Sequence, residues 1–124
     1  MIAAKTLIAA TVATAALGAA PAFAKSCKDV QINMDNQSGQ TIKIVDIDYQ
    51  YGGRWGSEAT PNFILHDDAT ASRERNLERA RGETTRVWVE YKMHKPRGGW
   101  GRKVGVFSDA QTCANGAIFD VVLK

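Results

Sequence analysis

Residues 87–93 read VWVEYKM, and this stretch decides the fold class. Val87, Val89, Tyr91 and Met93 are apolar and lie at every second position. A period of two is typical of a β-strand that buries one face. The stretch therefore predicts a strand whose four odd-numbered side chains face a core.

Similar apolar positions recur on both sides of this stretch. They occupy residues 30–34, 42–51, 63–65, 104–106 and 119–123, with turn-forming segments such as Asn36-Gln37-Ser38-Gly39 and Asn115-Gly116 between them. About seven short strands separated by frequent turns are typical of a sandwich. We expect an all-β fold, a small antiparallel β-sandwich of Ig-like or Greek-key type.

Two segments depart from simple alternation. The apolar positions change from even to odd near Ile44 and Val45, which predicts a β-bulge or a strand that crosses between sheets. Residues 69–82 could form a helix that begins at Ser72 and ends at Gly82. Because Leu77 is their only large apolar residue, we expect a polar edge strand or loop instead.

The N-terminal residues 1–24 have the pattern of a signal peptide. Lys5 precedes the apolar residues 6–17, and Ala22-Phe23-Ala24 supplies the small residues of a cleavage site. An N-terminal membrane anchor is the alternative, but the apolar run is short for a spanning helix. We expect cleavage after Ala24, export to the periplasm or the medium, and a single domain at residues 25–124.

Cys27 and Cys113 are the only two cysteines of the chain. In an oxidising compartment a single disulfide between them is the default. Lipidation of Cys27 is the alternative, which the charged Lys25 upstream disfavours and which would leave Cys113 unpaired.

The charge of residues 25–124 is only mildly positive. Fifteen of the sixteen lysines and arginines and all thirteen acids lie there, a net charge of +2. Proteins that bind nucleic acids through phosphate contacts usually carry a stronger basic bias. We therefore expect no nucleic-acid partner, and the absence of a second long apolar run predicts no transmembrane segment after cleavage.

Two hairpins of similar sequence are the candidate binding sites. Residues 47–56 read IDYQYGGRWG, and residues 89–103 read VEYKMHKPRGGWGRK. Each glycine pair suits a tight turn, and each tryptophan either folds onto the sheet or forms an exposed platform. If the hairpins bind, the binding residues are Arg54, Trp55, Lys95, Arg97, Trp100, Arg102 and Lys103. Because residues 92–103 carry no acid, we expect an acidic protein partner, with an anionic surface as the alternative.

Catalytic and metal-binding patterns are weak. The two histidines, His66 and His94, have no serine or cysteine context that indicates a triad, and we predict no catalytic residues. His66-Asp67-Asp68 is the best local metal candidate, but a solvated loop is the simpler interpretation. We expect no metal site and no cofactor. A small hydrolase remains open only because Glu58, Glu74, Glu83 and Glu90 could converge in space.

Residues 36–42, NQSGQTI, resemble the N-x-S-G-x-T-I start of a strand in the aegerolysins, which are small β-sandwich proteins that bind membranes. The resemblance implies a membrane-binding module. Exposed Trp55 and Trp100 would also suit sugar rings or lipid headgroups, so the alternative is a surface-active or sugar-binding module that uses these two tryptophans. We rank this alternative below a non-enzymatic interaction protein, such as an inhibitor or immunity-type binder of an enzyme or toxin.

Overall fold

The computed structural model describes residues 25–124, so the predicted signal peptide lies outside the described residues. Residues 25–124 contain strands and no helix. The strands are β2 (Cys27–Asn36), β3 (Ile42–Tyr51), β4 (Arg54–Ala59), β5 (Phe63–Leu65), β6 (Thr70–Leu77), β7 (Thr84–His94), β8 (Trp100–Phe107), β9 (Gln111–Thr112) and β10 (Ile118–Leu123). The all-β prediction is confirmed, and the expected strand over residues 87–93 lies within β7.

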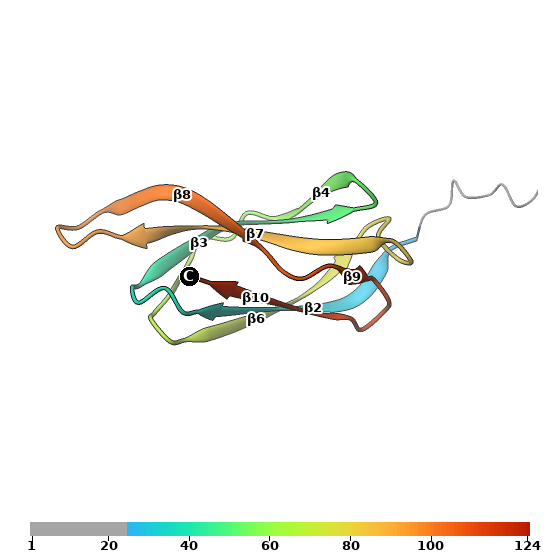
Figure 1. Ribbon diagram of the computed structural model, residues 1–124, viewed down its shortest axis with the longest axis horizontal. Helices are drawn as coiled ribbons and strands as arrows, with labels where there is room; N and C mark the ends of the chain where they lie inside the picture. Colours follow the sequence, from blue (N-terminus) through green and yellow to red (C-terminus); the bar gives the residue numbers. More distant parts are fainter. Residues whose placement is uncertain (1–24) are drawn as a thin grey trace, which may run out of the picture.

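The strands form two sheets that face each other (Figure 1). The smaller sheet has the order β10-β2-β6, and the larger has the order β4-β3-β7-β8, with β5 also on β3 and β9 also on β7. Two stacked sheets confirm the β-sandwich. One pair departs from the antiparallel pattern, because β10 runs parallel to β2.

The core lies between the sheets and follows the predicted alternation. Val87 and Val89 of β7 and Ile32 of β2 have no exposed surface, and Phe119 of β10 is the largest fully buried side chain. Burial of alternate apolar side chains on two facing sheets supplies the main favourable free energy of such a fold.

The predicted change of phase in the second strand is a bulge. Ile44 pairs with Tyr91 and Asp46 pairs with Glu90, with a register shift between the two pairs. The bulge inserts Val45, so Ile44 and Ile47 both point into the core although one is even and the other odd.

Residues 70–77 form β6, the edge strand of the smaller sheet, so the helix alternative for residues 69–82 is wrong. The inner face of β6 links the two sheets. Arg73 stacks its guanidinium 4.3 Å from the centre of the Phe63 ring, and Arg75 pairs with Glu58 of β4 at 3.4 Å.

Asn36 joins three segments at the end of β2 and is completely buried. Its side-chain amide donates hydrogen bonds to the carbonyls of Gln40 at 2.8 Å and Leu65 at 2.9 Å. Its side-chain oxygen accepts from the amide and the hydroxyl of Ser38. These bonds satisfy the buried amide, and the polar residues of the NQSGQTI stretch therefore hold a turn.

The predicted disulfide between Cys27 and Cys113 is present, with the two Cα atoms 6.1 Å apart. Cys27 begins β2 in the smaller sheet, and Cys113 directly follows β9, which belongs to the larger sheet. The bond therefore ties one sheet to the other.

Candidate functional site

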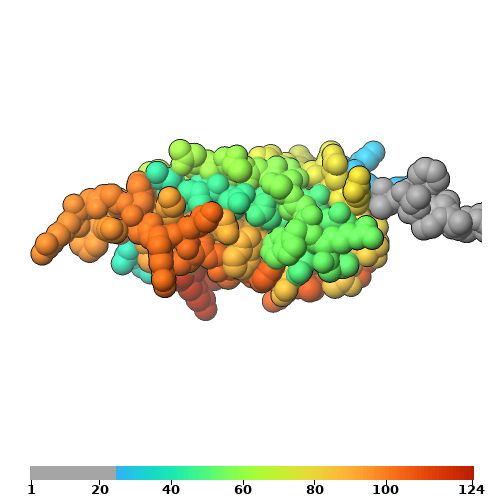
Figure 2. Space-filling model, turned by 90° about the horizontal axis from the view of Figure 1, so that it is seen from above, coloured from blue at the N-terminus to red at the C-terminus, as the bar shows by residue number. Residues whose placement is uncertain are grey.

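The β7–β8 hairpin extends beyond the rest of the sandwich at the left of Figure 1. Figure 2, which views the molecule from above, shows the hairpin in orange extending beyond the left end of the molecule. Two backbone hydrogen bonds of 2.9 Å close its turn, from Lys95 to Gly99 and from Gly98 to Lys95. Gly98 and Gly99 have φ values of 94° and 79°, which favour glycine. We call residues 92–103 the basic arm.

Trp100 is braced on the outer face at the base of the turn, and it is half-buried. The His94 ring meets it edge-on, with 5.2 Å between ring centres. Lys43 of β3 places its ammonium group 4.7 Å from the centre of the Trp100 ring. These contacts fix the direction of the arm relative to the sheet.

Most of the positive charge of the arm is free to meet another molecule. The arm carries the cations Lys92, Lys95, Arg97, Arg102 and Lys103 and no acid. Among the ion pairs of residues 25–124, one involves the arm, between Lys103 and Glu90 at 3.3 Å. The hydrogen bond from Trp88 and the contact with Lys103 lower the pKa of Glu90, against the effect of burial. Lys95, Arg97 and Arg102 are exposed.

The second predicted hairpin, β3–β4, presents a different surface. Gly52 and Gly53 form its turn with φ values of 52° and 84°, and Arg54 after them is exposed. Trp55 is 55% exposed, the highest value among the large apolar side chains of residues 25–124. The hairpin therefore presents an indole to solvent.

Trp55 belongs to an aromatic cluster with Trp88 and Phe107. Its ring centre lies 6.4 Å from that of Trp88, edge to face, and 5.8 Å from that of Phe107. Trp88 and Phe107 lie 4.5 Å apart. The guanidinium of Arg86 stacks 3.6 Å from the centre of the Phe107 ring. A Cβ atom at Gly105 would overlap the Trp88 indole, so a glycine is needed beneath it.

Carboxylates of the same outer face lie beside this cluster. Burial, and secondly the charge of Asp46, raise the pKa of Asp48. One oxygen of Asp46 is buried without a hydrogen-bond partner. A surface hollow beside the cluster is lined by Asp48, Trp55, Gly56 and Ser57. Among residues 25–124, no three His, Cys, Asp or Glu side chains are placed to hold a metal ion.

The predicted binding residues divide into two groups. Lys95, Arg97, Trp100, Arg102 and Lys103 share the basic arm, whereas Arg54 and Trp55 lie at the other end of the face. Trp100 contacts Lys43 and Trp55 pairs with Gln50. Lys43 and Gln50 are seven positions apart along β3, which corresponds to a distance of roughly 23 Å along the strand. The two tryptophans therefore do not form one platform.

Sequence reasoning missed several side chains of this face, namely Lys43, Arg86, Trp88 and Phe107. The outward position of Trp88 could have been predicted, because Trp88 lies between the buried positions Val87 and Val89 of a strand. Phe107 and Arg86 come together with Trp55 only through the pairing of β3, β4, β7 and β8.

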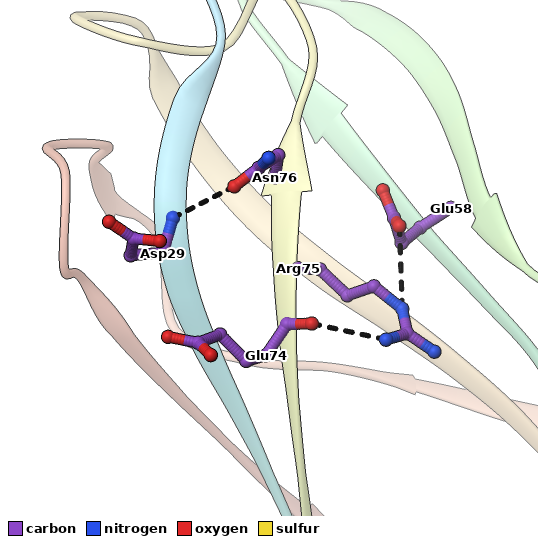
Figure 3. A network of polar contacts seen from close by, with 5 residues as sticks. All are labelled: Asp29, Glu58, Glu74, Arg75 and Asn76. Carbon is purple, nitrogen blue, oxygen red and sulfur yellow. Dashed lines mark hydrogen bonds and ion pairs between the residues drawn. The ribbon is translucent and has the colours of Figure 1, made fainter.

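A polar network lies at the edge between β6 and β4 (Figure 3). Arg75 pairs with Glu58 and donates to the carbonyl of Glu74 at 3.1 Å, while Asn76 accepts from the amide of Asp29 at 3.0 Å. Burial raises the pKa of Glu58, and Arg75 lowers it by a smaller amount. Asp29, Glu58, Glu74, Arg75 and Asn76 line one shallow surface hollow, and Figure 3 shows the Arg75 side chain turned toward Glu58 and the Glu74 carboxylate on the other side of β6.

The other candidates of the sequence take structural or exposed positions. His66, Asp67 and Asp68 are exposed in the loop after β5, and Asp67 accepts a hydrogen bond of 2.9 Å from the amide of Gly39. Glu83 lies in the connection between β6 and β7, whereas Glu90 faces outward on β7.

No protein-family model and no curated protein matches the chain. In residues 36–42, the stretch that resembles the aegerolysins, the side chains of Asn36 and Ser38 bond to each other and to the carbonyls of Gln40 and Leu65. Within residues 25–124, no helix has the length and apolar content to cross a bilayer.

Proposed function

We propose that this chain is an exported, non-enzymatic binding protein that docks the basic arm onto an acidic surface of a partner protein. The observation that carries the proposal is the projection of the arm from a braced Trp100, with Lys95, Arg97 and Arg102 exposed. Arginine and tryptophan are enriched at protein interfaces, and a rigid hairpin loses little conformational entropy on binding.

Export is supported by the signal-peptide pattern of residues 1–24 and by the disulfide, since disulfides persist in oxidising compartments. A small exported domain with a rigid charged hairpin suits an inhibitor or immunity-type binder of an enzyme or toxin. An arm without acids favours association with an acidic surface and raises the rate of encounter.

The test compares two charge-matched triple variants of the mature protein. One replaces Lys95, Arg97 and Arg102 with alanine; the control replaces the exposed Lys25, Lys28 and Lys124. The protein, carrying a photo-crosslinking residue at Arg97 or at the distant Thr60, is mixed with the exported proteins of its own cell. We expect one acidic protein to crosslink from position 97 and not from position 60.

Affinity for that protein should fall roughly tenfold or more in the arm variant and stay nearly unchanged in the control. It should also weaken as salt is raised. Equal affinity of the two variants would contradict the proposal. Arm-dependent co-sedimentation with phosphatidylglycerol vesicles, without a crosslinked protein, would assign the arm to an anionic lipid surface instead.

A further inference from the structure

The aromatic cluster at the other end of the outer face has features that the basic arm does not explain. Trp55 is largely exposed, yet its orientation is fixed by Trp88 and Phe107. Trp88 is itself held by a hydrogen bond of 3.0 Å from its indole nitrogen to Glu90. A large apolar ring that is both exposed and held in place is preorganised to meet a ligand.

The groups around the exposed indole are polar. The hollow beside Trp55 is lined by Asp48 and Ser57, and the Ser57 hydroxyl lowers the pKa of the Asp48 carboxylate against the larger effect of burial. An apolar partner surface laid over Trp55 would cover these groups and leave their remaining hydrogen-bonding capacity unmet, which costs free energy. A ligand with one apolar face and a rim of hydroxyl groups would satisfy both the ring and the rim.

The charges near the hollow select against anions. Asp46, Asp48 and Glu90 share this face, and burial, and secondly the charge of Asp46, raise the pKa of Asp48. Arg86, a cation of the same cluster, is already engaged by Phe107 and by Gln50, to which its Nε atom donates at 2.9 Å. Phosphate or sulfate groups would meet carboxylates here.

We propose that Trp55, Asp48 and Ser57 form a subsite for a neutral saccharide, whose pyranose ring stacks on the Trp55 indole while its hydroxyl groups bond to the carboxylate and the serine. Equatorially substituted, β-linked pyranoses fit best, because both faces of their rings present only C–H groups. This subsite is separate from the basic arm and does not depend on the arm's partner.

The test is titration calorimetry of the mature protein with cellohexaose and chitohexaose, which are neutral and β-linked, and with maltohexaose as an α-linked control. We expect saturable binding of at least one β-linked probe, unaffected by added salt because no net charge is neutralised. Binding should also change the tryptophan fluorescence.

Three variants locate the site. Trp55→Ala should weaken binding on the order of tenfold or more, and Trp55→Tyr should retain most of the affinity, because it preserves a ring for stacking. Trp100→Ala, on the same face but about seven residues of β3 away, should bind as the unchanged protein does. Because Trp55 is exposed, its variants should fold, which near-ultraviolet circular dichroism checks.

Several results would overturn the inference. These are no binding of any probe at millimolar concentration, equal affinity of Trp55→Ala and the unchanged protein, or equal losses from Trp55→Ala and Trp100→Ala. Binding of a sulfated oligosaccharide that is lost with the arm cations and kept in Trp55→Ala would place sugar recognition on the arm, and would also count against the subsite.

Discussion

At the scale of single residues, the outer face of the larger sheet carries a local electrostatic cost. Asp46, Asp48 and Glu90 lie on adjacent strands, and like charges on neighbouring positions of a sheet are destabilising. Glu90 is compensated by Trp88 and Lys103, whereas Asp48 has Ser57 as its favourable partner. A ligand-binding role of Asp48 would account for a carboxylate at a position where its charge costs free energy.

The raised pKa of Asp48 makes the stability depend on pH with a defined sign. Folding favours its protonated form, so the folded state binds more protons than the unfolded state between the unfolded pKa, about 3.8, and the raised folded value. The contribution of this group is therefore present at low pH and is lost as pH rises through the folded pKa.

Asp48→Asn should accordingly stabilise the protein at pH 7 by about 0.5 kcal/mol, or roughly 2–4 °C in Tm, because it removes the ionised carboxylate and keeps the shape. The gain should disappear near pH 3. Thermal unfolding followed by circular dichroism at both pH values measures it. Asp109→Asn, at an exposed position between β8 and β9, serves as the control and should change neither value. A gain that persists at pH 3 would show that charge is not its cause.

At the scale of elements, β10 is an edge strand with unusual exposure. Ile118 and Val122 on its outer side are 50% and 40% exposed. In a parallel pair of strands, every second residue directs both its N–H and its C=O group to the partner strand. In β10 these are the odd-numbered residues, because the backbone carbonyls of Ala117 and Leu123 accept hydrogen bonds from the backbone amides of Gln31 and Gln37. The backbone groups of the even-numbered residues therefore face the edge of the sheet, where the carbonyl of Ile118 accepts a hydrogen bond of 2.6 Å from the Gln111 side chain.

Asp120 lies at the centre of this edge. If two copies paired antiparallel through β10 with side chains in phase, Ile118 would face Val122 and Asp120 would face its own copy. Opposed carboxylates disfavour that pairing, which is how edge strands avoid aggregation.

Asp120→Val should therefore shift self-association to lower protein concentration, by roughly tenfold or more, as measured by sedimentation velocity. Asp35→Val is the matched control, since Asp35 faces the same side from β2, the central strand. If both variants associate equally, surface hydrophobicity and not edge pairing is responsible. If neither associates, the open edge is protected by something other than Asp120.

At the scale of the whole molecule, local patterns predicted the fold well and the binding face only in part. The alternation in VWVEYKM and the change of phase at Ile44 follow from the two-residue period of a strand. They could therefore be predicted from the sequence alone. No local pattern in the sequence determines which sheet edge β10 joins, so its parallel pairing with β2 could not be predicted. The cluster of Trp55, Trp88 and Phe107 likewise depends on the register of β3, β4, β7 and β8, which is set by the global arrangement.

The disulfide acts at this largest scale, because it joins the two sheets across a sequence separation of 86 residues, at the end of the sandwich away from the basic arm (Figure 1). Closing so long a loop reduces the entropy of the unfolded chain and should contribute about 4 kcal/mol. A domain of this size has a net stability of only about 5–15 kcal/mol.

The double variant Cys27→Ser/Cys113→Ser should therefore lose roughly 15–30 °C in Tm while still folding cooperatively at room temperature. Addition of a reductant should lower the Tm of the unchanged protein to a similar value and leave the Tm of the variant as it was, which separates loss of the bond from loss of packing around the sulfur atoms.

Because the arm is held by Trp100, His94 and Lys43 and not by the cysteines, the folded variant should keep its affinity for the partner. If the variant has the same Tm as the unchanged protein, core packing alone holds the sheets together. If the folded variant loses affinity for the partner, the disulfide also positions the arm.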